Sequence, residues 1–181
     1  QLSIRNHNDA LRQVTRAMQE VQRAQAAARG VAAYQDNAGE NPYAPGTLLP
    51  NVPNGLGPGG LEVDPGVSAD PSLWQGAELP TETSVGNGGV QVDILQTEPS
   101  AFLNWKTYNV GRLTHLRYDQ SAGGVDTPSW IAFNQVNDPS AYPSQILGSI
   151  SADGQVYVIN RNGVVFGAAS QVNVRGLTVS S

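Results

Sequence analysis

Four aspartates in the second half of the sequence are the residues whose type and spacing could support acid–base chemistry. They are Asp119, Asp126, Asp138 and Asp153. Clustered carboxylates, often with a basic residue or calcium, cleave polysaccharides on β-rich scaffolds. Each of the four lies near a turn signal, as in Asp138-Pro139 and Asp153-Gly154, and Asp is favoured in turns because its side chain hydrogen-bonds the nearby backbone. We therefore expect turn residues, and a carbohydrate-active enzyme remains an alternative.

The other reactive residue types do not assemble a site. The chain has no cysteine, only two histidines and no serine elbow, so a hydrolase triad has little support. His115 lies in the alternating run Leu113 to Tyr118, which predicts a strand side chain, and no second histidine is close enough in sequence to suggest a metal site. We predict a protein that is not an enzyme and that needs no metal and no cofactor.

One glycine pattern has the spacing of a dinucleotide-binding loop. Residues Gly55 to Gly60, "GLGPGG", match Gly-x-Gly-x-x-Gly. A phosphate-binding loop follows a strand and opens a helix. Here no strand precedes the pattern, Pro58 interrupts it and "LEVDPG" follows it, so we expect no nucleotide site.

The charge balance argues against a nucleic-acid partner. The chain has fifteen acidic and ten basic residues, for a net charge of -5, whereas binding to phosphates needs a basic surface. A hydrophobic content of 39% is compatible with a packed core. No run of eighteen apolar residues is present, and the first residues lack an apolar signal segment, so we expect any secretory signal to precede Gln1.

The chain divides into three regions. Residues 1–35 predict a helical segment, with a helix over 8–30. Residues 36–80 predict an extended connection without continuous helix or ladder pairing, because eight of the twelve prolines and seven glycines lie between Pro42 and Pro80. Trp74 is expected to anchor this connection on the body. Residues 81–181 contain short apolar runs separated by Gly, Asn, Asp or Pro, which predict an all-β region.

Three all-β architectures compete for residues 81–181: a sandwich, a closed barrel and a parallel β-solenoid. Runs of three to five residues with single Gly or Asn bends favour the solenoid, in which each turn stacks on the previous one. The segment Asn160 to Gly163 looks like a hairpin turn. Asn and Gly tolerate left-handed backbone conformations, so we interpret it as a corner at which the strand continues onto another face.

Several stretches resemble a known family. Leu103-Asn104-Trp105, Tyr108-Asn109-Val110-Gly111 and the run from Pro143 to Val174 are similar to the amino-terminal secretion domain of filamentous-haemagglutinin-like exoproteins of two-partner secretion. The resemblance covers about Leu79 to Ser181. The family motif Asn-Pro-Asn-Gly corresponds to Asn160 to Gly163, with Arg161 in place of proline. A second motif, Asn-Pro-Asn-Leu, is absent, and the nearest stretch is Phe133 to Val136.

The resemblance implies a right-handed parallel β-helix, preceded here by the helix and the Pro/Gly-rich segment. It implies a secretion and folding-nucleation domain of a large adhesin- or filament-type exoprotein, located outside or on the surface of a diderm bacterium. The partner would be an outer-membrane transporter, whose periplasmic domains would pair with amphipathic stretches such as Val90 to Leu95 and Gln171 to Arg175. A host or cell-surface receptor is a further expected partner, and a self-associating filament subunit is the alternative function.

Five positions are predicted to matter for corner geometry or transporter recognition: Asn104, Asn109, Asn160, Asn162 and Gly163. Leu177 to Val179 predict another strand, whose free edge we expect to meet a following turn of the chain or a second copy. Five aromatic residues could form a sugar-stacking platform, but core packing is the favoured interpretation. They are Trp105, Tyr108, Trp130, Phe133 and Phe166.

Overall fold

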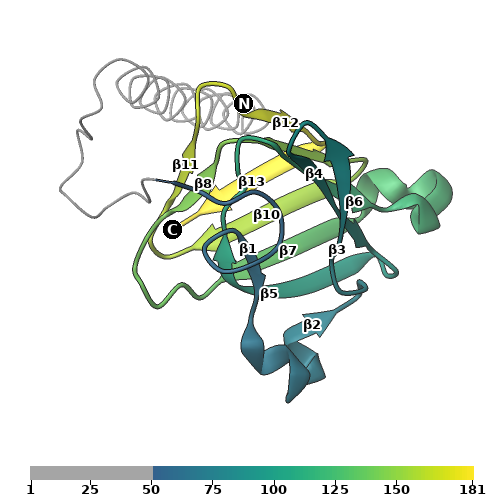
Figure 1. Ribbon diagram of the computed structural model, residues 1–181. Helices are drawn as coiled ribbons and strands as arrows, with labels where there is room; N and C mark the ends of the chain where they lie inside the picture. The colour runs from purple at the N-terminus through teal and green to yellow at the C-terminus, as the bar shows by residue number, and fades with distance from the viewer. Residues whose placement is uncertain (1–50) are drawn as a thin grey trace, which may run out of the picture. The chain divides into compact units, whose positions relative to one another are not determined.

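The computed structural model of the protein describes residues 51–181 (Figure 1). The helix expected over residues 8–30 and the first part of the expected extended connection, residues 36–50, lie outside the described residues. The described part of the chain is mainly β, which confirms the expected class. No helix in this part is both long and apolar enough to cross a membrane.

The strands form three sheets in which most neighbours run parallel. The long sheet contains, in order, β5 (Ser100–Tyr108), β7 (Ile131–Val136), β10 (Gln155–Asn160) and β13 (Gly176–Ser180). The second sheet contains β4 (Gly89–Leu95), β6 (Thr114–Asp119), β9 (Ser149–Ala152) and β12 (Gln171–Asn173). The short sheet pairs β8 (Ser144–Ile146) with β11 (Val164–Phe166).

The chain visits these sheets repeatedly in the same order. We call each passage a lap: lap one is β5, Val110 and β6; lap two is β7, β8 and β9; lap three is β10, β11 and β12. The strands of successive laps are in register, so that Phe102 lies opposite Phe133 and Phe133 lies opposite Tyr157. Each lap therefore hydrogen-bonds mainly to the laps before and after it, and parallel strands are confirmed as the main form of pairing.

The long sheet and the second sheet each have a first parallel strand, β5 and β4, whose outer edge is not covered by a lap. Antiparallel strands pair with these two edges. On β5 these are β1 (Leu61–Val63) and β2 (Trp74–Gln75), and on β4 it is β3 (Thr81–Gly86). The short 3-10 helices η1 (Pro65–Ser68) and η2 (Pro71–Leu73) connect β1 to β2. The sequence excluded continuous pairing over residues 51–80 but did not indicate these short strands. Strands of two or three residues fit between the prolines and glycines, which exclude only longer ones.

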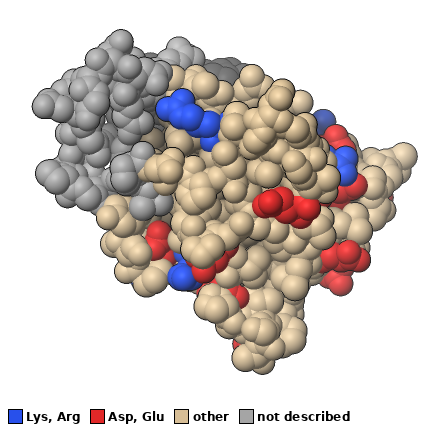
Figure 2. Space-filling view, viewed as in Figure 1, with Lys and Arg blue, Asp and Glu red and all other residues tan. Residues whose placement is uncertain are grey.

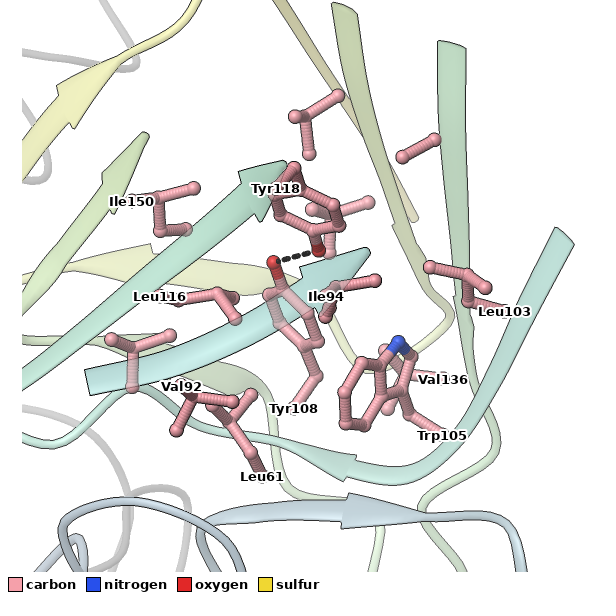
Figure 3. Packing of buried hydrophobic residues seen from close by; sticks show 14 of the residues in the cluster. Leu61, Val92, Ile94, Leu103, Trp105, Tyr108, Leu116, Tyr118, Val136 and Ile150 are labelled. Carbon is pink, nitrogen blue, oxygen red and sulfur yellow. Dashed lines mark hydrogen bonds between the residues drawn. The ribbon is translucent and has the colours of Figure 1, made fainter. Parts of the chain in front are cut away.

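The core lies between the long and the second sheet and follows the strict alternation of strand side chains. In β5, Ala101, Leu103 and Trp105 are buried, and Val92 and Ile94 of β4 are buried in the same way. Trp105 packs edge-on against Trp74 of β2, as expected for an anchor, with ring centroids 5.0 Å apart. Figure 3 shows Trp105 and Tyr108 side by side among aliphatic side chains from both sheets. Burial of these side chains holds the sheets together.

The longest connection joins β6 to β7 and contains the 3-10 helix η3 (Ser121–Ser129), whose backbone is kinked at Gly124. Figure 1 shows this segment projecting from the edge of the sheets. Gly123 lies so close to the Trp130 indole that an added Cβ would come within 2.7 Å of the ring. Trp130 is buried, so its ring anchors the base of the projection.

Candidate functional site: an asparagine corner

The segment Asn160 to Gly163 connects β10 of the long sheet to β11 of the short sheet. The Asn162 N–H donates to Asn160 Oδ1 at 2.9 Å, and the Gly163 N–H donates to the Asn160 carbonyl at 2.8 Å. Gly163 has φ of +91°, a conformation that side chains with a Cβ adopt at a cost. The two flanking strands pair with different neighbours, β7 and β8 respectively, so the chain turns a corner and does not form a hairpin.

The Asn160 side chain ties this turn to the preceding lap. It is 1% exposed, and its Nδ2 donates to Ser144 Oγ of β8 at 2.9 Å. The Ser144 N–H donates to the Gly163 carbonyl at 3.0 Å, and Asn162 Nδ2 donates to the Asp138 carbonyl at 3.4 Å. The turn of lap three is therefore shaped by contacts with lap two as well as by its own residues.

Asn109 holds the other side of β8. The Gln145 N–H donates to Asn109 Oδ1 at 2.7 Å, while Asn109 Nδ2 donates to the Gly59 carbonyl at 3.0 Å. Asn109 is also 1% exposed. The beginning of β8 is thus fixed by a buried asparagine from the lap before and a buried asparagine from the lap after. We call this set the asparagine corner: Asn109, Ser144, Gln145, Asn160, Asn162 and Gly163.

Asn104 lies outside the asparagine corner. It is on the face of β5 that points away from the core, and its Nδ2 donates to the Leu73 carbonyl at 2.9 Å. Its own carbonyl accepts the Asp64 N–H at 3.1 Å. Asn104 therefore fastens the segment between β1 and β2 onto lap one. Of the five positions predicted from the sequence, the structure brings four together and places this one elsewhere.

The glycine pattern at Gly55 to Gly60 supports the same corner. The Gly55 N–H donates to Thr114 Oγ1 at 2.8 Å, and the Gly57 N–H donates to the Leu61 carbonyl at 3.0 Å. The carbonyl of Gly60 accepts the Asn109 N–H at 3.0 Å. The Gly55 and Gly57 N–H groups are bonded within the fold and are therefore not available to a phosphate. The loop instead packs against the first lap.

A second polar column was not predicted from the sequence. Gln96 follows β4, Gln120 follows β6, and both are fully buried. Gln120 Nε2 donates to Gln96 Oε1 at 2.9 Å, and Gln120 Oε1 accepts the Gly154 N–H at 2.6 Å. In the sequence, each of two strands that pair in register is followed directly by a glutamine. This pattern can be recognised only when the register of the two strands is known.

Two of the aspartates considered for catalysis serve in turns. The carboxylate of Asp119 accepts the Ser121 N–H at 3.1 Å, and Asp138 accepts the Ser140 N–H at 2.8 Å, as expected for turn residues. The hydrogen bonds from Ser121 hold the pKa of Asp119 below its ordinary value. No three His, Cys, Asp or Glu side chains within residues 51–181 lie close enough together to hold a metal ion.

Charged residues on the outer face of the second sheet pair with one another. Arg117 donates to Asp93 at 2.6 Å and to Asp119 at 3.1 Å, and the hydrogen bond to Asp93 raises the pKa of the guanidinium. His115 Nδ1 lies 2.5 Å from Ser149 Oγ on the next strand of this sheet. Figure 2 shows few charged side chains on the face in view, in separate small groups. On the face in view, the residues that the structure describes form no continuous basic surface.

The aromatic residues divide between core and surface. Trp105, Tyr108 and Trp130 are buried, so they cannot receive a sugar. Phe133 lies on the outer face and stacks on Phe102 at 5.1 Å between ring centroids. The faces that these two rings turn toward each other are closed to a ligand, so the stack offers less aromatic surface to a sugar than two separate rings would.

Comparison with known proteins decides the family. The model of the TPS secretion domain, the secretion domain of two-partner secretion, matches residues 66–181, which include all three laps and most of the covering strands. The chain belongs to the TPS secretion domain family. As a TPS domain, it is the secretion domain of a two-partner-secreted exoprotein, and membership implies an outer-membrane transporter as its partner.

Two curated proteins are similar to this TPS domain. A heme/hemopexin-binding protein of Haemophilus influenzae strain Rd is 32% identical over 96 residues, 53% of this chain and 10% of that protein. A second heme/hemopexin-binding protein of Haemophilus influenzae is 30% identical over 91 residues, 50% of this chain and 9% of that protein. The TPS domain thus matches about a tenth of the length of these relatives.

Proposed function

We propose that the TPS domain is a right-handed parallel β-helix that serves as the amino-terminal folding nucleus of a large surface or secreted exoprotein. The supporting observation is the asymmetry of the stack. The edges that precede lap one are covered by β1, β2 and β3, whereas each later lap pairs in parallel with the one before it. The first strands cannot extend the stack backwards, because their outer edges are already paired. Folding therefore proceeds from lap one onward, and chain that emerges from the transporter adds to laps that have already formed.

In this proposal the asparagine corner determines the path of the chain from the long sheet to the short sheet, which the domain needs in order to fold during export. Asn109 and Asn160 are buried and bonded within the fold, so the folded domain does not offer them to a transporter. Their role in recognition would belong to the chain before folding. The proposal assigns adhesion, filament formation and any receptor to the rest of the exoprotein, and it assigns no catalysis to this domain.

The same reasoning applies to the stretch Val90 to Leu95. In the folded domain it lies within β4 and is paired on both sides, with β3 and β6. Its backbone can pair with a strand of the transporter's periplasmic domains only while the chain is extended. We therefore propose that recognition precedes folding and that β4 formation releases the transporter.

The test separates recognition from folding with two matched variants. The pair Val92→Ser/Ile94→Ser alters β4, and Val156→Ser/Val158→Ser makes an equivalent change at buried positions of β10. Both weaken the core. The β4 variant should lose binding of the urea-unfolded chain to purified periplasmic domains of the transporter, and the β10 variant should retain it. Equal binding by both variants would refute recognition through β4.

Export itself is tested in the source bacterium. The intact exoprotein and one lacking residues 66–181 are produced with the partner transporter, and the exoprotein is measured in medium and periplasm by immunoblot. We expect the shortened form to accumulate in the periplasm. Its appearance in the medium at the level of the intact form would exclude a secretion function for this domain.

The alternative, self-association, has one observation in its favour. Leu177 and Val179 lie on the core-facing side of β13 in the alternation of the sheet, yet they are 36% and 38% exposed. Apolar side chains in this position favour contact with further β-structure. Sedimentation of the 181-residue chain tests this alternative: Val179→Asp should lower the sedimenting mass if copies meet at this edge, and a monomeric parent would exclude it.

A further inference from the structure

The centre of the core contains a buried side-chain amide that lies outside the asparagine corner. Asn134 of β7 points inward and is 0% exposed. Its neighbours on the inward face of the same strand are Ala132 and Val136, which are also buried. A polar side chain in such surroundings is costly unless its hydrogen bonds are made.

All hydrogen-bonding groups of Asn134 have partners. Its Oδ1 accepts from Trp105 Nε1 at 2.9 Å and from the Tyr118 hydroxyl at 2.8 Å. Its Nδ2 donates to the Tyr157 carbonyl at 3.0 Å. Because Tyr118 donates its only proton to Asn134, the Tyr108 hydroxyl, 2.8 Å away, must donate to Tyr118. Figure 3 shows the hydroxyls of Tyr108 and Tyr118 meeting inside the core.

These partners belong to different laps. Trp105, Tyr108 and Tyr118 are in lap one, and Asn134 is in lap two. The bond from Asn134 to the Tyr157 carbonyl reaches lap three, but a carbonyl recurs at every second residue along a strand, so it does not distinguish one register from another. By contrast, the Trp105 N–H and the Tyr118 hydroxyl each occur at one place in lap one. Their hydrogen bonds to Asn134 therefore define the register of β7 on lap one.

Apolar packing alone leaves this register weakly defined. A shift of β7 by two residues keeps every inward side chain inward, and hydrophobic contacts have no direction. The Trp105 ring makes its aromatic contacts with Trp74 and Tyr108, before β7 is added. Its N–H makes a hydrogen bond to a side chain of lap two, and that bond has a direction that apolar contacts lack. A shifted strand would leave the Trp105 and Tyr118 donors buried without an acceptor.

We propose that Asn134 is the register-setting residue of the stack, which fixes lap two on lap one through Trp105 and Tyr118. A single buried asparagine sets register in coiled coils by the same physical means. This inference rests on hydrogen bonds within the described residues and does not depend on the transporter, so it can fail while the proposed export function holds, and the reverse.

The test measures register by disulfide cross-linking after refolding of the full 181-residue chain. The natural chain has no cysteine, so introduced pairs react only with each other. Asn104→Cys/Gln135→Cys reports the native register, in which these residues lie opposite one another. Lys106→Cys/Gln135→Cys reports a two-residue shift. In the parent chain we expect the native pair to cross-link and the shifted pair to remain reduced.

Three backgrounds are compared with the parent. Asn134→Leu leaves two donors unpaired. A second background also carries Trp105→Phe, Tyr108→Phe and Tyr118→Phe, so all four polar side chains of this network are replaced by apolar ones. Both should lower the ratio of native to shifted cross-link by about tenfold, the effect expected when one or two net hydrogen bonds are lost. The third background, Tyr108→Phe/Tyr118→Phe, keeps Asn134 and Trp105 and should lower the ratio by about threefold.

The control is Ile131→Val, a conservative change at an outward-facing position of the same strand. It should change the ratio less than Asn134→Leu does. An unchanged ratio in refolded Asn134→Leu, or an equal fall in Ile131→Val, would overturn the proposal. If neither variant with Leu at position 134 refolds, the Tyr108→Phe/Tyr118→Phe background decides, and an unchanged ratio there overturns it.

Discussion

Asn109 Oδ1 accepts a hydrogen bond of 2.7 Å from the backbone N–H of Gln145, thirty-six residues later in the chain. This contact joins the end of β5 to the beginning of β8, one lap further on. Because both groups are buried, losing the acceptor leaves a donor that water cannot reach. A second buried asparagine also joins two laps, because Asn160 Nδ2 donates to Ser144 Oγ of the preceding lap.

Asn109→Ala should therefore destabilise the domain by about 1–3 kcal/mol, because the Gln145 N–H and the Gly59 carbonyl both lose their partner. Urea unfolding followed by circular dichroism measures the change. The control is Asn173→Ala on the exposed side of β12, with an expected change within about 0.5 kcal/mol. Equal effects of the two substitutions would show that the asparagine corner is not a special contact.

Gly163→Ala should cost about 1–2 kcal/mol through backbone conformation alone. The φ of Gly163 is +91°, and the nearest atom to an added Cβ is the Pro143 Cβ at 4.0 Å, so there is no steric clash to confuse the result. Gly176→Ala is the matched control, because no positive φ is found there and the nearest contact is 3.5 Å. Comparison of the two unfolding curves tests whether the corner needs glycine.

Alkaline pH should destabilise the domain through the Tyr108–Tyr118 pair. Burial raises the pKa of both hydroxyls above the ordinary 10.0, and the charge of Tyr108 adds to the effect on Tyr118. The folded state therefore keeps protons that the unfolded chain releases above pH 10. The contribution to stability is complete below that pH and falls above it, by up to about 3 kcal/mol per pH unit for two groups.

Urea unfolding at several alkaline pH values measures this slope. Tyr108→Phe/Tyr118→Phe should reduce it, whereas Tyr157→Phe, an outward-facing position, should leave it as in the parent. A slope that survives the removal of both buried hydroxyls would mean that other groups control the alkaline transition.

The stacked rings of Phe102 and Phe133 should stabilise the pairing of β5 with β7. A double-mutant cycle with Phe102→Leu and Phe133→Leu should give a coupling energy of about 0.5–1.5 kcal/mol. Titration of the parent with neutral oligosaccharides, followed by aromatic fluorescence, should show no saturable binding, because the facing sides of the two rings are closed by their stacking. Zero coupling together with saturable sugar binding would restore the interpretation of this column as a ligand platform.

The sequence allowed the class of fold to be predicted but not the contacts between laps. Short apolar runs interrupted by Asn and Gly indicated parallel stacking, and Asn160 to Gly163 could be interpreted as a corner because both residue types tolerate its geometry. The bond between Asn134 and Trp105 could not be predicted, since it joins residues 29 positions apart and depends on the register of two strands. Spacing along the chain does not contain that register.

The candidate site shows the same limit. Asn160, Asn162 and Gly163 were selected by their turn chemistry and lie together. Asn104 and Asn109 were selected from stretches that carry the resemblance; Asn109 lies with the other three, and Asn104 lies on another face. The strands β1 and β2 were not predicted because two or three residues are too few to show a period of two. Their pairing is set by the edge of β5, which the local sequence does not describe.

The lap arrangement also determines how the difficulty of folding grows with size. Side chains that join one lap to the next lie close in sequence: Asn134 and Tyr157 are 23 residues apart, and Gln96 and Gln120 are 24 apart. The entropy lost in closing such a loop depends on that separation, so it stays nearly constant however many laps precede it. A protein built in this way can be elongated without becoming slower to fold per added lap, because its contact order does not rise in proportion to its length.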